Sequence, residues 1–488
     1  MAKRKSSGNV PQPQFKENHT PSQHDRRERL LQPNPNRQPT VDAKFPLIGG
    51  IAVLVGMMQR SLDARTAFRF SILFAGMFLA KGRRTVSSWF RGAGVGDDWD
   101  KFYESLQAIG KCPKSLMQTL LRTIVKHIGS NPDQYLTIAI DDSPTERFGK
   151  HVEGANIHHN PTPGPGDHEW LYGHNWVTAA ILAPHSKWGT IALPILANMY
   201  VRKVDIEALN AKHGLVFRTK IEMAIDITTQ IVNSARYEGC KATMQLVVDG
   251  AYATRDLLKA MFQSDVTVFS RLRSNSCLYD LPIPPIAPKR GRPRRYGVNK
   301  INLTKLAKCE DGWETVEYMC RGHKVVRQIK TFVATSKIAM GPIRVVIVKY
   351  ENGQWAAYFS SDPNRDVKSI LEGIADRWAI EEFFHDVKEV WQAGRQQVRN
   401  MWSNIACWHM NCWAYTMVEL ECWDTPKEDL VDRSSSPWDN PSRRPSHADR
   451  CRSIRAKMLA ERFSIELALD PNHSKIKPLF DELLALAS

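Results

Sequence analysis

The chain has 488 residues, and its 67 Lys and Arg residues outnumber its 51 Asp and Glu residues, which gives a formal net charge of +16. This length allows two to four domains, and the surplus of positive charge favours a polyanionic partner, most commonly nucleic acid, over a charge that serves solubility alone. The nine cysteines include no Cys-x-x-Cys pair, which argues against a disulfide scaffold or a zinc site. No secretory signal is visible and the longest apolar runs are too short to span a bilayer, so we expect a cytoplasmic protein with no membrane partner.

The first 130 residues divide into two parts. Residues 1–44 are rich in Pro, Gln, Asn and Arg and predict a disordered basic arm, whereas residues 45–130 have a helical pattern. Within the helical part, the turn at Lys81–Arg84 precedes Thr85, a residue able to cap the amphipathic helix that follows. This pattern resembles the second half of a helix-turn-helix, which would make 45–130 a DNA-binding domain with Arg83 and Arg84 as contacts. An ordinary helical hairpin with a solvated basic loop explains it equally well.

Residues 131–280 alternate between strands and helices. A long helix is expected over 206–237, and short apolar runs predict strands at 135–140, 176–182, 188–197, 243–248 and 266–270. The first run ends at Asp141-Asp142 and the fourth at Asp249. Three strands, a helix and a further strand form the order of an RNase-H-like sheet.

The remaining residues predict an insertion and a return to the first sheet. A Pro-rich break at 281–293 is followed by four alternating runs between 314 and 360, so we expect 281–360 to be a β-rich insertion. Helix returns at about 367–394 and continues to 422, which assigns 361–422 to the same RNase-H-like domain as 131–280. Residues 423–488 predict a polar linker and a C-terminal helical segment. The expected fold class is therefore α/β: an RNase-H-like mixed sheet with helices, interrupted by a β-rich insertion and preceded by an all-α region.

Asp142 and Asp249 are candidate metal ligands because each ends an apolar strand. An acidic residue at the tip of a buried strand is held rigidly, and two on neighbouring strands can share hard cations through their oxygens. Turns favour Asp everywhere, so neither residue is specific by itself.

A third carboxylate lies on a predicted helix. Arg377, Glu381 and Lys388 are separated by four and seven residues, which places them within about 40° of one another around a helix. The alternative is a plain ion pair on a solvated helix face.

The run RWAIEEFF with Lys388 resembles the Arg-Glu-Lys part of the YREK signature of bacterial insertion-sequence DDE transposases. The resemblance extends to IAIDDSPTERFGK, to LVVDGAYA and to the segment HHNPTPGPGDHEWLYGHNWV between them, and it covers roughly residues 80–420. It implies a catalytic triad of Asp142, Asp249 and Glu381. Asp142 is preferred to Asp141 because the family's aspartate directly precedes a small hydroxylated residue, here Ser143. The signature's Tyr is replaced by Ile374.

The resemblance also implies a reaction and partners. The triad would hold two Mg²⁺ ions, with Mn²⁺ as a substitute, for phosphoryl transfer on DNA, and Arg377 and Lys388 would position backbone phosphates. The expected partners are double-stranded DNA, as terminal inverted repeats and as target, and further copies of the chain in a dimer or higher synaptic complex. The localisation implied is the bacterial cytoplasm, at the nucleoid. A catalytically silent DNA-binding derivative and another RNase-H-like nuclease, such as a junction resolvase, remain alternatives.

Other basic residues are candidate DNA contacts. Arg290 and Arg292 lie in an Arg-Gly-Arg-Pro segment that resembles an AT-hook, in which the arginines enter a narrow minor groove. Arg271 and Arg273, just past the fifth strand, are further candidates. His158, His159, His168 and His174 lie in or beside a Pro- and Gly-rich loop without a nearby cysteine, which favours packing or DNA contact over zinc.

Overall fold

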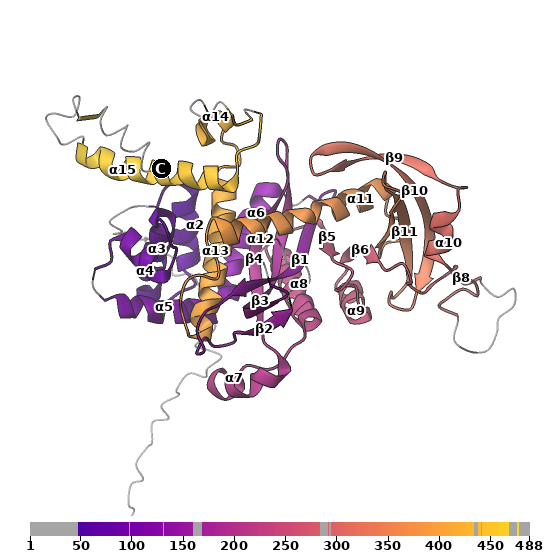
Figure 1. The fold of residues 1–488 in the computed structure, drawn as a ribbon, viewed down its shortest axis with the longest axis horizontal. Coiled ribbons are helices and arrows are strands. Elements are labelled where there is room, and N and C mark those ends of the chain that lie inside the picture. The colour runs from indigo at the N-terminus through magenta and orange to yellow at the C-terminus, as the bar shows by residue number, and fades with distance from the viewer. Residues whose placement is uncertain are drawn as a thin grey trace, which may run out of the picture. The chain divides into compact units, whose positions relative to one another are not determined.

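The computed structural model describes residues 47–96, 98–129, 131–159, 168–283, 291, 294–433, 438–440, 442–467 and 476–477 (Figure 1). The arm 1–44, Arg290 and Arg292 lie outside these residues. The predicted fold class is confirmed: a large mixed sheet carries helices, a β-rich insertion interrupts it, and an all-α region precedes it.

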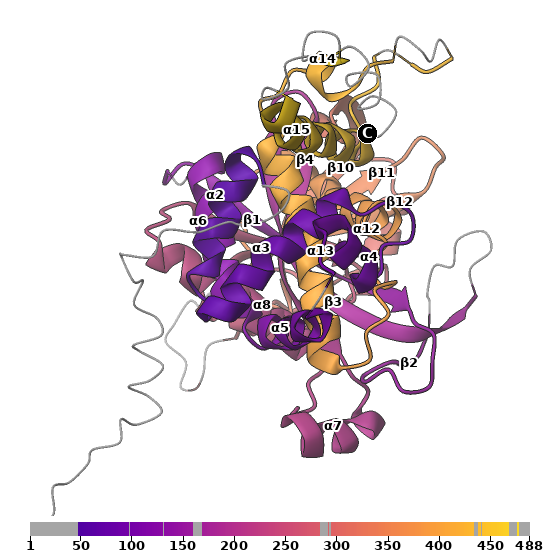
Figure 2. The ribbon, with the colours of Figure 1, turned by 90° about the vertical axis from the view of Figure 1, so that its left-hand side faces the viewer.

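The N-terminal region consists of helices that pack around a helix from the C-terminal part of the chain. These N-terminal helices are α2 (Gly49–Gln59), α3 (Ala64–Leu79), α4 (Val86–Ala93), α5 (Trp99–Lys111) and α6 (Pro113–Ile128). Of these, α2, α5 and α6 contact α13 (Met401–Glu421), which runs among them in Figure 2. Gly110 permits the closest approach, because a Cβ there would lie 1.9 Å from the Trp402 carbonyl oxygen. The helical region therefore shares one core with α13.

The strands of the first half form the RNase-H-like part of the sheet. They are β1 (Tyr135–Glu146), β2 (Asn156–His159), β3 (Trp170–His185), β4 (Gly189–Tyr200), β5 (Thr243–Val248) and β6 (Thr267–Leu272). Strand β1 pairs antiparallel with β3 and parallel with β5, and β5 pairs parallel with β6. Strand β1 is longer than the apolar run predicted, because its ladder with β3 continues through the polar residues as far as Glu146.

The helix expected over 206–237 is two helices. A short 3₁₀ turn, η1 (Lys203–Asp205), leads into α7 (Ile206–His213), and α8 (Lys220–Tyr237) follows after a break. Gly214 ends α7 in the left-handed conformation, and Thr219 begins α8 with a capping box to Glu222. Helix α9 (Arg255–Gln263) connects β5 to β6.

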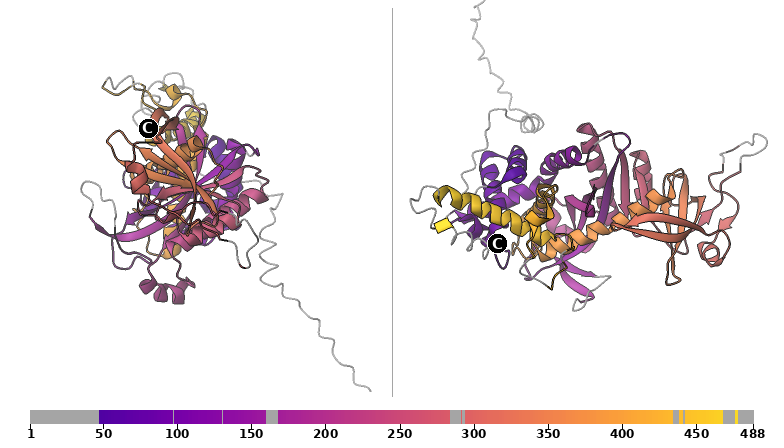
Figure 3. Two further views of the ribbon diagram at one scale, coloured as in Figure 1. Left: turned by 90° about the vertical axis from the view of Figure 1, so that its right-hand side faces the viewer. Right: turned by 90° about the horizontal axis from the view of Figure 1, so that it is seen from above.

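The insertion continues the RNase-H-like sheet. Its elements are β7 (Leu278–Tyr279), β8 (Lys300–Ile301), α10 (Leu303–Lys308), β9 (Glu314–Cys320), β10 (His323–Ser336), β11 (Pro342–Lys349) and β12 (Trp355–Ser360). Strand β12 pairs antiparallel with β6, and the order runs β2-β3-β1-β5-β6-β12-β11-β10-β7-β8 in one 12-stranded sheet that also includes β4 and β9. Figure 3 gives two further views of these strands.

The C-terminal part of the chain is helical, and three of its helices pack on the sheet. Its helices are α11 (Val367–Asp376), α12 (Trp378–Glu389), α13, α14 (Lys427–Leu430) and α15 (His447–Leu467), of which α14 and α15 pack on other helices. Helix α11 packs on β6, β9 and β12, and α12 packs on β1 and β4. None of the helices within the described ranges has both the length and the apolar character needed to cross a membrane.

Candidate active site

Asp141 and Asp142 face opposite sides of the sheet. Both lie inside β1, where successive side chains alternate between the two faces. Thr137 donates to the Gln245 side chain across the β1–β5 pair at 3.2 Å, which fixes the face that Thr137 shares with Asp141. Asp142 therefore lies on the other face.

The partners of Asp142 come from that second face. The Lys220 ammonium, at the start of α8, donates to Asp142 Oδ2 at 2.6 Å, and the Tyr252 hydroxyl donates to its Oδ1 at 2.8 Å. Both carboxylate oxygens are thus occupied by protein donors. Burial and the charge of Asp142 raise the pKa of Tyr252, which keeps its hydroxyl protonated as a donor.

Asp141 meets Glu381 through Arg377. One guanidinium nitrogen of Arg377 donates to Asp141 Oδ2 at 2.8 Å and the other donates to Glu381 Oε1 at 2.7 Å. Helix α12 begins directly after Arg377, so the predicted spacing of Arg377 and Glu381 falls on one helical turn. The side chain of Arg377 is only 20% exposed, which strengthens both ion pairs relative to pairs in open solvent.

Asp249 follows β5 beside Asp141. The parallel register aligns Ile140 with Val248, so Asp249 is the next residue on the neighbouring strand and shares the face of Asp141. Asp249 is exposed, and its side chain accepts a 3.4 Å hydrogen bond from the Ala251 backbone. Gly250 lets this turn lie against Arg271, because a Cβ there would approach the Arg271 carbonyl oxygen to 3.1 Å.

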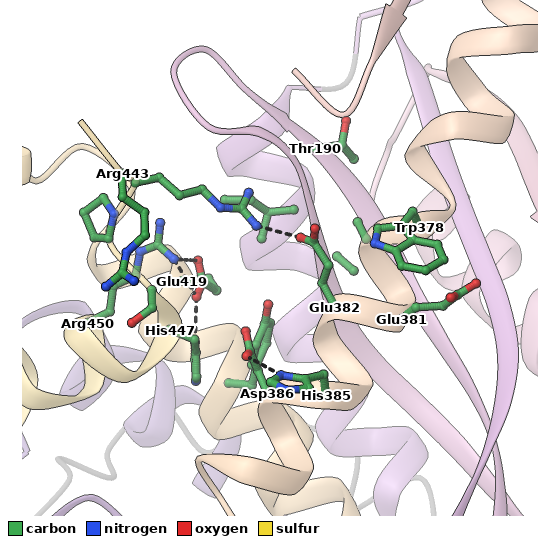
Figure 4. A pocket seen from close by; sticks show the side chains of 17 residues that line it. Thr190, Trp378, Glu381, Glu382, His385, Asp386, Glu419, Arg443, His447 and Arg450 are labelled. Atoms are coloured by element: carbon green, nitrogen blue, oxygen red, sulfur yellow. Dashed lines mark hydrogen bonds and ion pairs between the residues drawn. The ribbon is translucent and has the colours of Figure 1, made fainter. Parts of the chain in front are cut away.

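The neighbouring glutamate on α12 has a different role. Glu382 accepts a 2.7 Å hydrogen bond from Arg444, in the segment that precedes α15. Figure 4 shows Glu382 directed toward the arginines of that segment and Glu381 directed away from them. Both glutamates line a cavity of about 710 Å³, together with Trp378, Arg443 and Arg444 among others. The C-terminal segment therefore supplies cations to a cavity that reaches Glu381.

The environment of Asp141 favours its protonated form. Burial raises the pKa of Asp141 to about 6, and the negative charges of Asp142 and Glu381 act in the same direction. Arg377 opposes this rise without cancelling it. A carboxyl group in this situation gains from any further cation brought beside it.

The carboxylates fit a hard cation by donor type. Carboxylate oxygens are the ligands that Mg²⁺ prefers, and the Arg377 guanidinium already places a positive charge between Asp141 and Glu381. In the part of the chain that the structure describes, no three His, Cys, Asp or Glu side chains yet stand together as a metal-ligand group. Arg377 occupies one oxygen of each of these two carboxylates.

The predicted DNA contacts have different surroundings. Arg83, Arg271 and Arg273 are exposed. Arg84 is buried instead: it donates to the Met77 carbonyl at 2.9 Å, lies 5.1 Å from the Trp391 ring, and has its pKa lowered by burial to about 10. Arg84 therefore stabilises the interior and cannot reach DNA. Lys388 lies half-buried on α12, two turns after Glu381.

The helix after the Lys81–Arg84 turn is also largely buried. Thr85 caps α4 as expected, with its hydroxyl accepting from the Ser88 backbone at 3.3 Å. Five of the eight residues of α4 are buried, however, and Gly76 and Gly92 bring α3 and α4 into backbone contact. A recognition helix needs a free face for the major groove. The arrangement favours the helical hairpin over the helix-turn-helix.

The histidines serve packing. His174 is fully buried, bonds to Arg147 and to the Glu153 carbonyl, and has its pKa lowered by burial to about 3. His158 is buried beside Tyr200, and His159 contacts the Trp170 ring.

The fold is an RNase-H-like mixed sheet with helices, the class to which DDE nucleases belong. The family model described as DDE superfamily endonuclease matches residues 57–324, more than half of the chain, so this protein belongs to that family. No curated protein matches the sequence.

Among solved structures, one similar chain is that in the cryo-EM structure of a piggyBac transposase synaptic complex with hairpin DNA. It shares 10% sequence identity, with 90% of this chain and 75% of that chain covered and a TM-score of 0.35. A likeness at this level carries no argument about the site.

Proposed function

We propose that this protein is a DNA transposase that cleaves the ends of its mobile element and transfers the 3′ ends to target DNA, with Asp141, Asp249 and Glu381 as the catalytic carboxylates. The observation that carries this assignment is the bridge by Arg377 between Asp141 and Glu381. The parallel register supports it further, because Ile140 and Val248, which directly precede Asp141 and Asp249, are paired. Asp142, which the resemblance favours, is replaced in this proposal because its partners Lys220 and Tyr252 lie on the opposite face of the sheet, whereas Asp141 is joined to Glu381 through Arg377.

The residues of the site divide the work. When two Mg²⁺ ions are bound, with Mn²⁺ as a substitute, they supply nucleophile activation and leaving-group stabilisation for phosphoryl transfer. The three carboxylates would hold the ions, and burial fixes Asp141 in place. Arg377, on releasing a carboxylate, can turn to a DNA phosphate, and Lys388 is seven residues further along the same helix.

Partners and organisation follow from the same proposal. Double-stranded DNA is the substrate, as terminal inverted repeats and as target, and two ends processed together require a dimer or a higher assembly. Arg271 and Arg273, just past Asp249 in the sheet, are proposed phosphate contacts. We keep the domain ranges 45–130, 131–280 with 361–422, 281–360 and 423–488 as a proposal, although the first two share a core. A place beside the bacterial nucleoid, and membership of the YREK branch, belong to this proposal as well.

The assignment of the first aspartate has a direct test. DNA carrying the sequences that flank the gene is incubated with Mg²⁺, and cleavage is followed on gels for Asp141→Asn and Asp142→Asn. We expect Asp141→Asn, like Asp249→Asn and Glu381→Gln, to lose at least about a thousandfold in rate. The matched variant Asp142→Asn should lose less than about tenfold, because it removes a partner of Lys220 and no metal ligand. If Asp142→Asn instead lost the larger share of the cleavage rate and Asp141→Asn the smaller, Asp142 would be the catalytic residue.

Two alternatives have their own outcomes. Binding of the same DNA in EDTA, with no cleavage in Mg²⁺ or Mn²⁺, would identify a silent DNA-binding derivative. Cleavage without joining of the 3′ ends to target DNA would identify another nuclease of the class.

A further inference from the structure

A second pocket, of about 330 Å³, lies where three segments meet: the turn before α4, the loop after β1, and the loop between α12 and α13. Five of its twelve lining residues are Arg or Lys, and the described residues that line it include no Asp or Glu. The cations are Arg83, Arg147, Lys150, Arg395 and Arg399. By contrast, the cavity beside Glu381 is lined by acids and arginines together.

Arg147 forms the buried part of this pocket. It is 6% exposed, its Nε donates to His174 Nδ1 at 3.1 Å, and a terminal nitrogen donates to the Gly394 carbonyl. Neither partner, the neutral His174 imidazole or the Gly394 carbonyl, supplies a negative charge. Within the described ranges, no carboxylate pairs with Arg147, although a buried cation is costly without a counter-charge. Glu153, a nearby acid in the sequence, already pairs with Lys212 and His213.

The three segments are tied together, so the pocket is formed before any ligand arrives. The Arg84 backbone donates to Gln392 at 3.0 Å, and the Gln392 amide donates to Gly82 at 3.2 Å, which fixes the turn that carries Arg83. The Glu153 backbone donates to the Arg399 carbonyl at 2.9 Å and joins the other two loops.

Two features of the loop after α12 show that its shape is imposed. Gly394 has a φ of +100°, and a Cβ there would lie 2.9 Å from that of Thr145. Gln397, which lines the pocket, has a φ of +56° although it is not glycine. Backbone held in this region is costly and concentrates at functional sites.

We propose that this pocket binds a backbone phosphate of the DNA on which the active site works. A phosphate supplies the negative charge that Arg147 lacks, and exposed Lys150, Arg395 and Arg399 can surround it from the rim. This inference rests on the proposed function for the identity of the polyanion, whereas the pocket itself rests on its charges alone.

The pocket lies on the same side of the sheet as the catalytic carboxylates. Arg147 follows Asp141 by six residues, an even number, and its backbone N–H donates to the Tyr172 carbonyl at 2.9 Å, which continues the strand ladder. Six residues of strand span about 20 Å. Since duplex DNA rises about 3.4 Å per base pair, the bound phosphate would lie roughly six base pairs from the scissile bond.

Binding is measured in EDTA, so that cleavage plays no part, by fluorescence anisotropy on a 40-base-pair duplex from the DNA that flanks the gene. The double variant Lys150→Gln with Arg399→Gln should weaken binding about tenfold at 0.1 M salt. It should also make the slope of log K against log salt about one unit shallower. The control, Lys241→Gln with Lys259→Gln, removes two exposed cations elsewhere and should leave the slope unchanged.

A duplex scan locates the phosphate. A neutral methylphosphonate placed about six base pairs from the cleavage point should weaken binding by the wild type and have no further effect on the double variant. The proposal would be overturned if the methylphosphonate weakened binding by the double variant as much as binding by the wild type. It would also be overturned if the double variant bound DNA like the control. Binding of inorganic phosphate that depends on the pocket, with DNA binding unaffected, would make it a site for a free anion and also overturn it.

The outcome is separable from that of the proposed function. If the double variant loses binding in EDTA while the wild type never cleaves DNA in Mg²⁺, the pocket stands and the nuclease proposal falls. If the wild type and the double variant cleave DNA and bind it equally well, the phosphate-binding proposal is rejected and the nuclease proposal stands.

Discussion

Asp376 and Arg377, at the junction of α11 and α12, have opposite electrostatic surroundings. Arg377 lies between two carboxylates, whereas burial raises the pKa of Asp376 to about 6, against a hydrogen bond from Thr190 that lowers it. The negative charge of Glu372 raises the pKa of Asp376 as well. The charged form of Asp376 therefore costs stability in the folded protein.

We expect Asp376→Asn to stabilise the fold in a pH-dependent way. The folded pKa is above the unfolded value of 3.8, so the wild type loses stability as pH rises from about 4 through 6. Asn cannot ionise and keeps an oxygen for Thr190, so the variant should be more stable by roughly 2 kcal/mol at pH 8. Urea unfolding at pH 4.5 and pH 8 measures this gain, which should shrink toward zero at the lower pH. An equal gain at both values would show that ionisation is not the cause.

At the first carboxylate, our proposal of Asp141 differs by one residue from the sequence prediction of Asp142, and that one residue changes the face of the sheet. The apolar run stops at Ile140, which suggests that Asp141 and Asp142 follow the strand. The strand continues because β3 pairs with it through Glu146, and this tertiary pairing leaves no trace in the apolar pattern. A shift of one residue in a strand reverses the face, so a local motif cannot choose between adjacent aspartates. The helix residues Arg377 and Glu381 were predictable because helical spacing is fixed locally.

Among the elements, α13 and α15 are joined by a buried ion pair. Glu419, 2% exposed, accepts from His447 Nδ1 at 2.6 Å and lies 3.1 Å from Arg450. The Trp391 indole donates to His447 Nε2 at 2.8 Å, and the other ring nitrogen, Nδ1, faces Glu419. Burial alone would raise the pKa of Glu419, but Arg450 and the bond from His447 hold it below its ordinary value.

Glu419→Gln should therefore destabilise the protein by about 3–5 kcal/mol, because it leaves Arg450 buried without a counter-charge. The pKa of Glu419 is depressed, so this contribution is present above about pH 4.5 and is lost as pH falls below it. Thermal unfolding at pH 7 measures the loss. Glu421→Gln on the same helix is the control, since Glu421 accepts from the Ile51 backbone, which Gln can also satisfy. A similar loss in both variants would contradict the ion-pair explanation.

The sequence contains signals for the break between α7 and α8, although we predicted one helix there. Gly214 and the capping box of Thr219 with Glu222 are both local stop and start signals, whereas the apolar pattern on either side suggests one helix. The four longer strands of the insertion, β9 to β12, were predicted from alternation alone, whereas the two-residue strands β7 and β8 were not. The junction of the insertion with the catalytic sheet was not predicted, because the pairing of β12 with β6 joins residues about 90 positions apart and depends on tertiary structure.

At the scale of the whole molecule, the N-terminal helices share one hydrophobic core with the RNase-H-like part of the chain. The helices α2, α5 and α6 bury their apolar faces against α13, some 300 residues later. One continuous cluster of buried residues has members from Leu47 to Met458. A domain boundary requires few contacts across it. The region 45–130 thus has a predicted boundary in sequence but no separate core.

We expect a fragment of residues 45–130 to lack a folded core by itself, because the face that packs on α13 would be exposed. Adding α13 as a peptide of residues 398–423 should restore structure, since Gly110 and its neighbours regain the backbone of Trp402. Circular dichroism and the dispersion of amide signals in NMR spectra measure both states. A peptide with Ala406→Pro, in the interior of α13, removes the helical hydrogen bond to the Trp402 carbonyl and should restore much less. A fragment that folds cooperatively without the peptide would show that the helical region is an independent domain, free to act on DNA apart from the catalytic sheet.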